Sequence, residues 1–191
     1  MKKIASILGI GFFLSILITG CGEITIPSED GSETKIDLKG LEDGNLDISV
    51  EDSEGETVSM DVESDGENTT LVQSDGETEV ESNIGENVTL PEDFPSEFPF
   101  PEEIKLTAVQ TVTDAETKTY MIHYEYDQDL ESISAIYKEY AESKGYTISL
   151  EQKMENSYNL NAGDDEGKGF SAYLGYLEEN TAMISVTSPM E

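Results

Sequence analysis

Hydrophobic and polar side chains alternate along much of this chain, and the alternation predicts β-strands. Between residues 22 and 90, aliphatic side chains recur at every second position, as at Leu46, Ile48 and Val50. A period of two places them on one face of a strand and the intervening polar side chains on the other. The pattern recurs in four further groups: Ile24/Ile26, Ile36/Leu38, Val58/Met60/Val62 and Val88/Leu90. We therefore expect a series of short strands with one apolar face.

Short turn signals separate these predicted strands. They are five acidic-residue–glycine pairs and one weaker pair: Asp30-Gly31, Asp43-Gly44, Glu54-Gly55, Asp65-Gly66, Asp75-Gly76 and Ile84-Gly85. Glycine accepts, and aspartate tolerates, the positive φ of the two central residues of a type I′ hairpin turn. Three arrangements of residues 22–90 stay open: a meander packed on the following domain, a short solenoid-like stack, and a disordered segment, because aliphatic residues are few.

One amphipathic helix is predicted in the last hundred residues. Its apolar residues are spaced three or four apart: Leu130, Ile133, Ile136, Tyr137, Tyr140 and Ala141. Asp127 or Asp129 is the expected N-cap, and Gly145 lies where a glycine would end the helix. Strand patterns lie on both sides of the helix, over residues 104–113, 117–126, 146–150, 158–162, 170–176 and 182–186.

This order of elements, ββαββββ, predicts the fold class α+β. Residues 91–191 would form an antiparallel sheet with the single amphipathic helix laid across one face. An acidic β-hairpin or meander, or a partly disordered segment, would precede this domain. Roughly one hundred residues are enough for such a core.

Four prolines separate the alternating pattern of residues 22–90 from the strand and helix patterns that follow, at Pro91, Pro95, Pro99 and Pro101. Proline removes a backbone donor and restricts the residue before it, so residues 91–101 form neither a helix nor a central strand. Phe94, Phe98 and Phe100 alternate with these prolines. We expect residues 91–101, the strap, to be extended and to dock its rings on the following domain. A recruitment site for a polyproline-binding partner is the alternative.

The aromatic residues mark a boundary in the chain. All nine tyrosines, and every phenylalanine beyond the first twenty residues, follow residue 91. Residues 21–90 contain no aromatic residue, and they carry 21 acidic residues against two lysines. We therefore expect a signal peptide in residues 1–20, an acidic β-repeat spacer in residues 21–90 and the α+β domain in residues 91–191.

The first twenty residues have the pattern of an export signal. Lys2 and Lys3 precede an apolar run from Ile4 to Ile18, and small residues lead to Cys21, the only cysteine of the chain. This stretch resembles the lipobox of bacterial lipoproteins, in which the cysteine is acylated and becomes the new N-terminus. The resemblance implies that Cys21 carries a lipid anchor at the outer face of the cytoplasmic membrane. An uncleaved membrane helix is the alternative, but the run is shorter than the roughly 20 residues that cross a bilayer.

The formal net charge of −32 opposes binding to nucleic acid or to anionic lipid headgroups. With Cys21 lipidated no disulfide can form, so packing alone must stabilise the fold. Carboxylates crowded on one face of a sheet repel one another, and cations relieve that repulsion. Weak binding of divalent cations, with little selectivity, is therefore left open.

The residues that could carry catalysis or hold a metal form no complete motif. Residues 61–72 begin like an EF-hand loop, but Glu63 stands where Asp or Asn is needed, and Val72 where a bidentate Glu is needed. His123 is the only histidine, and we expect it partly exposed beside a carboxylate, on the strand face opposite the tyrosines. We predict no catalytic residue, no metal ligand and no cofactor.

Two motifs of a structural kind, rather than a catalytic one, lie in the C-terminal half. Leu90-Pro91-x-Asp93-Phe94-Pro95 precedes two predicted strands, and Tyr137-Lys138-x-x-Ala141-x-x-x-Gly145-Tyr146-x-Ile148 lies at a helix-to-strand junction. They resemble a group of uncharacterised lipoproteins from Gram-positive bacteria, over residues 90–191 and loosely over the acidic stretch before them. The resemblance implies location and fold, and it transfers no catalytic residue.

Two classes of function follow. The first is a membrane-anchored, non-catalytic binding module of the cell envelope, in which the aromatic sheet or its loops hold another envelope protein or a small ligand. The second is a small extracytoplasmic hydrolase that uses paired carboxylates. A deep pocket with two carboxylates of separated pKa would favour the enzyme, and a shallow exposed aromatic patch would favour the module. We expect the binding module.

Overall fold

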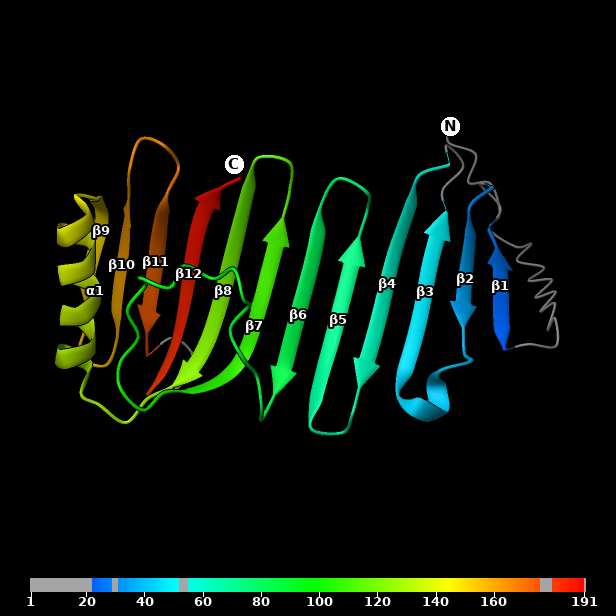
Figure 1. The fold of residues 1–191 in the computed structure, drawn as a ribbon, viewed down its shortest axis with the longest axis horizontal. Helices are drawn as coiled ribbons and strands as arrows, with labels where there is room; N and C mark the ends of the chain where they lie inside the picture. Colours follow the sequence, from blue (N-terminus) through cyan, green and yellow to red (C-terminus); the bar gives the residue numbers. More distant parts are fainter. Residues whose placement is uncertain (1–21, 29–30, 52–54, 176–179, 191) are drawn as a thin grey trace, which may run out of the picture.

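The computed structural model describes residues 22–28, 31–51, 55–175 and 180–190. These residues form one antiparallel sheet of twelve strands, with an α-helix near one edge (Figure 1). The strands are β1 (Glu23–Pro27), β2 (Glu33–Asp37), β3 (Asn45–Glu51), β4 (Thr57–Ser64), β5 (Asn68–Ser74), β6 (Glu79–Gly85), β7 (Lys105–Thr113), β8 (Thr117–Glu125), β9 (Thr147–Lys153), β10 (Tyr158–Gly163), β11 (Gly169–Leu174) and β12 (Thr181–Pro189). Helix α1 spans Leu130–Lys144, and a short 3-10 helix, η1, spans Leu41–Asp43.

The sheet runs without a break from the acidic part of the chain into the aromatic part. Strands β1 to β8 form a meander in which each strand pairs with the next. After α1 the chain returns, and the sheet ends in the order β8-β12-β11-β10-β9. Strand β6 pairs directly with β7, with Val80 opposite Val112. Of the arrangements considered for residues 22–90, the described residues form a meander, joined to the following strands edge to edge.

The predicted fold class, α+β, is wrong, because the protein is mainly β. Strands take up 53% of the described residues and helices 11%. The ββαββββ prediction treated residues 91–191 as a separate two-layer unit, whereas six further strands extend the same sheet. Helix α1 packs mainly on β9, β10 and β11, and one of its side chains, Tyr137, also reaches Tyr124 of β8. A helix about 10 Å wide covers only two or three strands spaced about 4.8 Å apart, so this one cannot form a second layer over twelve.

Glycine occupies the turns where the sequence predicts it. Gly66 and Gly76, in the β4–β5 and β5–β6 turns, have φ of 91° and 88°. The turns are not of type I′, because their second central residues, Glu67 and Glu77, lack the positive φ that this type requires. Instead the Asp65 carboxylate accepts hydrogen bonds from the backbone amides of Glu67 and Asn68, at 2.9 and 2.7 Å. The pairs at 30–31 and 54–55 fall partly outside the described residues.

Helix α1 begins and ends as its sequence predicts. The N-cap is Asp129, whose carboxylate accepts the amide hydrogen of Ser132 at 2.9 Å, and Gly145 ends the helix with a φ of 70°. Ile133, Tyr137 and Ala141 are buried against the sheet. Ile136 is only partly buried, because at 3.6 residues per turn it lies about 100° from the centre of this stripe.

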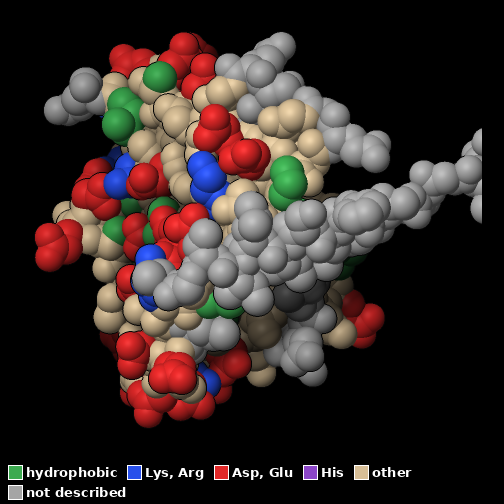
Figure 2. Space-filling model, turned by 90° about the vertical axis from the view of Figure 1, so that its right-hand side faces the viewer, with side chains coloured by type: hydrophobic (Ala, Val, Ile, Leu, Met, Phe, Trp, Pro, Cys, Tyr) green, Lys and Arg blue, Asp and Glu red, His purple; other side chains and the backbone are tan. Residues whose placement is uncertain are grey.

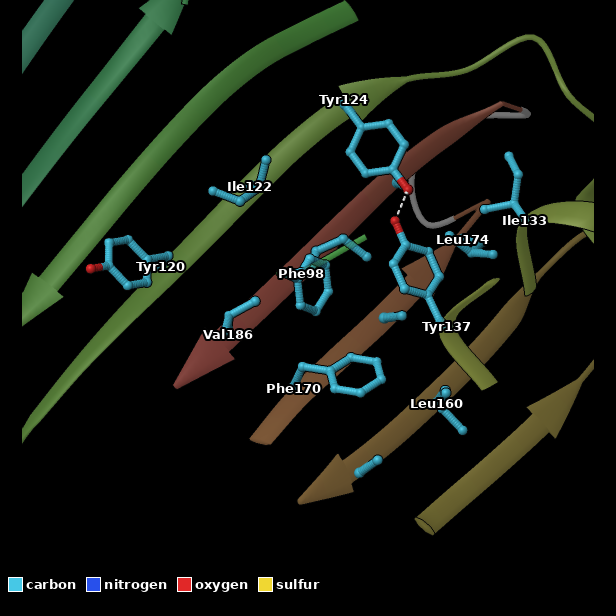
Figure 3. Close-up of a cluster of buried hydrophobic side chains, with 14 of the residues drawn as sticks. Phe98, Tyr120, Ile122, Tyr124, Ile133, Tyr137, Leu160, Phe170, Leu174 and Val186 are labelled. Carbon is cyan, nitrogen blue, oxygen red and sulfur yellow. Dashed lines mark hydrogen bonds between the residues drawn. The ribbon is translucent and has the colours of Figure 1, made fainter. Parts of the chain in front are cut away.

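The core lies between one side of β7–β12 and two covering elements, α1 and the strap (Figure 3). The fully buried side chains there include Ile122, Tyr124, Ile133, Tyr137, Leu160, Leu174 and Ile184. The expected docking of the strap is confirmed, but its expected extended conformation is wrong, because two turns form in which the Phe94 and Phe98 amides donate to the carbonyls of Pro91 and Pro95. Phe94 and Phe98 are buried, with ring centroids 5.3 Å from Tyr120 and 5.8 Å from Tyr137. Val88 and Leu90, predicted in a strand, lie outside any strand and pack against this core.

Candidate functional site

The predicted lipidation site, Cys21, lies outside the described residues, as does the predicted signal peptide of residues 1–20. The anchor therefore stays a prediction from sequence. Within the part of the chain that the structure describes, no helix combines the length and the apolar character that a membrane crossing requires.

The two faces of β1–β6 differ completely in charge. The strand register places all the residues of one face in continuous rows, for example Ile24, Ile36, Ile48 and Met60. We call this the uncharged face, because none of its strand residues is ionisable. Its members are Ile24, Ile26, Thr34, Ile36, Leu46, Ile48, Val50, Val58, Met60, Val62, Ser64, Thr69, Leu71, Gln73, Val80, Ser82 and Ile84.

Every ionisable residue of these six strands lies on the opposite side, which we call the acidic face. Its charged residues are Glu23, Glu33, Lys35, Asp37, Asp47, Glu51, Asp61, Glu63, Glu79 and Glu81. Alternation alone produces this segregation, because an antiparallel register keeps cross-strand partners on one face.

The apolar side of the sheet changes between β6 and β7. Glu81, Thr111 and Tyr120 stand in one register row, so the acidic face continues into the side that carries the buried core. The uncharged face continues instead into a side that mixes apolar residues such as Met121 with polar ones such as His123. Both α1 and the strap pack on the core side. Among the described residues, no helix or strap lies over the uncharged face.

The uncharged face is therefore accessible, although its neighbours shield part of each side chain. Val50 and Val58 stand opposite each other, with 38% and 40% of their surface exposed. Ile26 and Ile84, at the two sides of the face, are 36% and 56% exposed. Contiguous exposed apolar surface of this kind marks sites where proteins bind other molecules.

The acidic face holds carboxylates in direct opposition. Glu23, Asp37, Asp47 and Asp61 occupy one register row across four strands. Like charges placed opposite each other destabilise a sheet. Two lysines relieve part of the repulsion: Lys35 lies 3.7 Å from Glu51, and Lys39 lies 3.0 Å from Asp37. Hydrogen bonds from the Lys39 backbone and side chain lower the pKa of Asp37.

The described residues contain no group of three or more His, Cys, Asp or Glu side chains placed to hold a metal ion. The stretch that begins like an EF-hand loop forms a hairpin. Asp61 and Glu63 lie in β4, Asp65 lies in the turn, and Val72 lies in β5. Weak binding of divalent cations by the acidic face stays a prediction.

His123 lies on β8, on the side away from Tyr120 and Tyr124, as the alternation predicts. It is partly buried between its cross-strand neighbours Ala108 and Met183, and desolvation lowers its pKa. A cavity of about 190 Å³ beside it is lined by threonine, tyrosine, alanine and methionine residues and by Glu125. This small hollow does not enclose a substrate as active-site pockets do.

Every carboxyl of the described residues whose pKa departs clearly from its usual value is shifted downward. Backbone amides in the turns lower the pKa of Asp65, Asp75 and Asp114, and the Lys118 ammonium lowers that of Asp93. A glycosidase needs the opposite for its general acid, a carboxyl with a raised pKa. A hollow of about 850 Å³ at the β5–β6 and β7–β8 turns is lined by acidic residues that include Asp114, whose pKa is lowered. The hydrolase alternative stays a prediction.

Sequence reasoning found the alternation in β1–β4 but missed the extent of the uncharged face. Strands β5 and β6 complete it with Leu71, which is followed by the apolar Val72, and with Val80 and Ile84, which stand among polar residues or glycine. Cross-strand pairing, rather than the local pattern, places Leu71 opposite Val62 and brings Val80 and Ile84 onto the same face one strand further along. The same reasoning missed that the apolar side changes between β6 and β7. It also placed the binding surface on the aromatic sheet, but the tyrosines of β8 are buried in the core.

Comparisons with protein-family models, with curated proteins and with solved structures found no match to this chain. The candidate site therefore rests on the geometry described above.

Proposed function

We propose that this chain is a lipid-anchored protein of the outer face of the cytoplasmic membrane, similar to the lipoproteins named above. Its anchor is Cys21, and it acts as a non-catalytic binding module of the cell envelope. The uncharged face of β1–β6 is its binding surface. One observation carries the proposal: in a chain of net charge −32, this six-stranded face has no charged residue.

An apolar face exposed to water is unfavourable in a protein unless another molecule binds to it. Exposed apolar patches of several hundred Å² on a monomer mark interaction sites or invite aggregation. The acidic face needs no partner, because carboxylates are well solvated. The hydrophobic contribution of the uncharged face becomes available only when another molecule removes it from water.

The proposed place in the cell follows from the order of segments along the chain. The acidic strands lie between Cys21 and the helix-covered part of the sheet. Six strands spaced about 4.8 Å apart span about 29 Å. The acidic β-repeat thus acts as spacer and binding surface together.

Site-specific photocrosslinking on living cells tests the binding surface. A photoreactive amino acid replaces Val58 on the uncharged face in one variant, and Thr57 on the acidic face in the other. Both side chains are exposed and adjacent in sequence, so they differ mainly in the face they occupy. We expect adducts with an envelope component from position 58 and not from position 57. Equal adducts at both positions, or adducts at neither, would contradict the proposed surface.

Labelling with radioactive palmitate tests the anchor. The wild-type chain should incorporate the label, and Cys21→Ala should not. Label retained by Cys21→Ala would show that the anchor has been assigned to the wrong residue.

A further inference from the structure

The uncharged face is bordered at both ends of its strands by acidic turns. Glu56 and the β5–β6 turn with Asp75 and Glu77 lie at one end, and η1 and the β4–β5 turn at the other. Figure 2, viewed from the β1 side of the sheet, shows acidic side chains at the top and the bottom of the molecule, where the strands end, as well as along its left side and near its centre. We call the turns at these two ends the acidic rims.

The rims carry charge at neutral pH. Backbone amides donate to the carboxylates of Asp65 and Asp75, which lowers the pKa of each. The exposed carboxylates of Glu42, Glu77 and Glu86 add to the same rims. A strand of seven residues is about 23 Å long, so the two rims stand roughly that distance apart.

This distribution of charge favours some of the molecules that could bind an apolar face and disfavours others. A second copy of the chain, packed face to face, would bring acidic rims against acidic rims. An anionic membrane surface would be repelled by the same carboxylates. A peptide with an apolar middle and a cationic group at each end would match both the face and its rims.

We propose that the uncharged face binds cationic amphipathic peptides, with apolar side chains on the strands and Lys or Arg side chains at the acidic rims. This inference rests on the proposed function and names its partner. The available surface, about 29 by 23 Å, is somewhat smaller than one side of a standard protein interface, about 800 Å². It suits an isolated helix of about eighteen residues, which is about 27 Å long.

The probe is a synthetic eighteen-residue amphipathic helix with leucines along one face and two lysines at each end. Two companion peptides replace the four lysines by glutamate or by glutamine. Binding is measured by titrating each peptide into the whole chain held in discs of zwitterionic lipid, with empty discs subtracted. We expect the lysine peptide to bind best, and raised salt to weaken its binding, because the ion pairs are exposed.

Variants of the chain separate the two parts of the surface. The double variant Val50→Thr/Val58→Thr keeps shape and strand propensity but replaces one methyl group by hydroxyl at each position. We expect affinity for the lysine peptide to fall about tenfold, because the variant no longer buries two methyl groups against the peptide. The triple variant Glu42→Gln/Glu77→Gln/Glu86→Gln should lower it about tenfold as well, as for three exposed ion pairs.

A matched control removes the same charge from the acidic face. Glu33→Gln/Glu63→Gln/Glu79→Gln changes the net charge equally and leaves the rims intact. It should retain most of the affinity for the lysine peptide. An equal loss in both triple variants would overturn the role of the rims, because net charge alone would then explain the binding.

The remaining outcomes separate failure of the inference from failure of the proposed function. If the glutamine peptide binds as well as the lysine peptide, and the valine variant weakens both, the face binds ligands but the cationic partner is wrong. If the valine variant leaves every peptide unaffected, the face is not the binding surface and both proposals fail. A dimer in sedimentation that Val50→Thr/Val58→Thr dissociates would replace the peptide by a second copy.

Discussion

The hydroxyl oxygens of Tyr124 and Tyr137 lie 2.5 Å apart in the core, where β8 faces α1 (Figure 3). Burial raises the pKa of both phenols, so both stay protonated and one donates to the other. This hydrogen bond ties the helix to the centre of the sheet. A buried hydroxyl that loses its only partner keeps its desolvation cost without compensation.

Tyr137→Phe should therefore destabilise the protein by about 1–3 kcal/mol, measured by urea unfolding of the whole chain. The double variant Tyr124→Phe/Tyr137→Phe should cost less than the sum of the two single changes, since it leaves no orphaned hydroxyl. Strict additivity in this double-mutant cycle would show that the two hydroxyls do not interact.

Burial differs sharply between two isoleucines on the same helix. Ile133→Ala should cost about 2–5 kcal/mol, because this side chain is fully buried in the core. Ile136→Ala should cost clearly less, since Ile136 lies at the border of the buried stripe. Both values come from urea unfolding, and Ile136 serves as the matched control. Similar losses at the two positions would contradict the orientation of α1.

The last part of the chain should fold without the acidic strands. All nineteen buried hydrophobic residues lie between Phe94 and Val186, so residues 91–191 keep the whole described core. We expect a cooperative thermal melt of a 91–191 fragment, followed by circular dichroism. A broad, non-cooperative melt would mean that β6 is needed to complete the fold at the edge of β7.

Repulsion between Asp47 and Asp61 should be measurable in the unfolding midpoint. These residues face each other across β3 and β4, whereas Glu63 on the same strand faces Asn45 and Thr70. At low salt, Asp61→Asn should raise the thermal midpoint more than Glu63→Gln does. At about 1 M salt, where the Debye length is about 3 Å, the difference should disappear.

Calcium and magnesium should raise the midpoint of the wild type to similar extents at millimolar concentration. Saturable, submicromolar calcium binding would contradict the weak and unselective binding expected of the acidic face.

Alkaline pH should destabilise the protein. Burial raises the pKa of Tyr140 and of Tyr158, each to about 12, from an ordinary value of 10. The unfolded chain therefore loses these protons first as the pH rises, so stability is retained below about pH 10 and falls between about pH 10 and 12. Tyr140→Phe/Tyr158→Phe should flatten this dependence in urea unfolding across that range. An unchanged slope would assign the alkaline loss to other groups.

Local pattern predicted the individual elements well and the architecture poorly. The spacing of Ile133, Tyr137 and Ala141, with Asp129 and Gly145 at the ends, identified α1, since a helix depends on residues close in sequence. The fold class failed because Val80 pairs with Val112, across the whole strap. No local signal encodes that pairing, and the prolines of the strap indicated a boundary instead.

The uncharged face, too, could be predicted from the sequence only in part. Alternation from Ile24 to Val62 predicts one apolar side, but nothing in it says which side of the sheet α1 will cover. That depends on the register through β6 and β7, where Glu81 and Tyr120 fall on the same side. Strand β5 escaped prediction because adjacent apolar residues, Leu71 and Val72, obscure the period of two.

The order of the strands in this one continuous sheet has a mechanical consequence. Strand β1 lies at one edge and α1 near the other (Figure 1), so a pull between the two acts across the strands, along their hydrogen bonds. Strands loaded in this direction separate one at a time, beginning with those that have the fewest buried side chains. Only one residue of β1–β6, Ser82, is buried, whereas the core lies beyond β6. Tension on a tethered molecule would unzip the acidic strands in sequence and lengthen the tether, while the aromatic core stays folded.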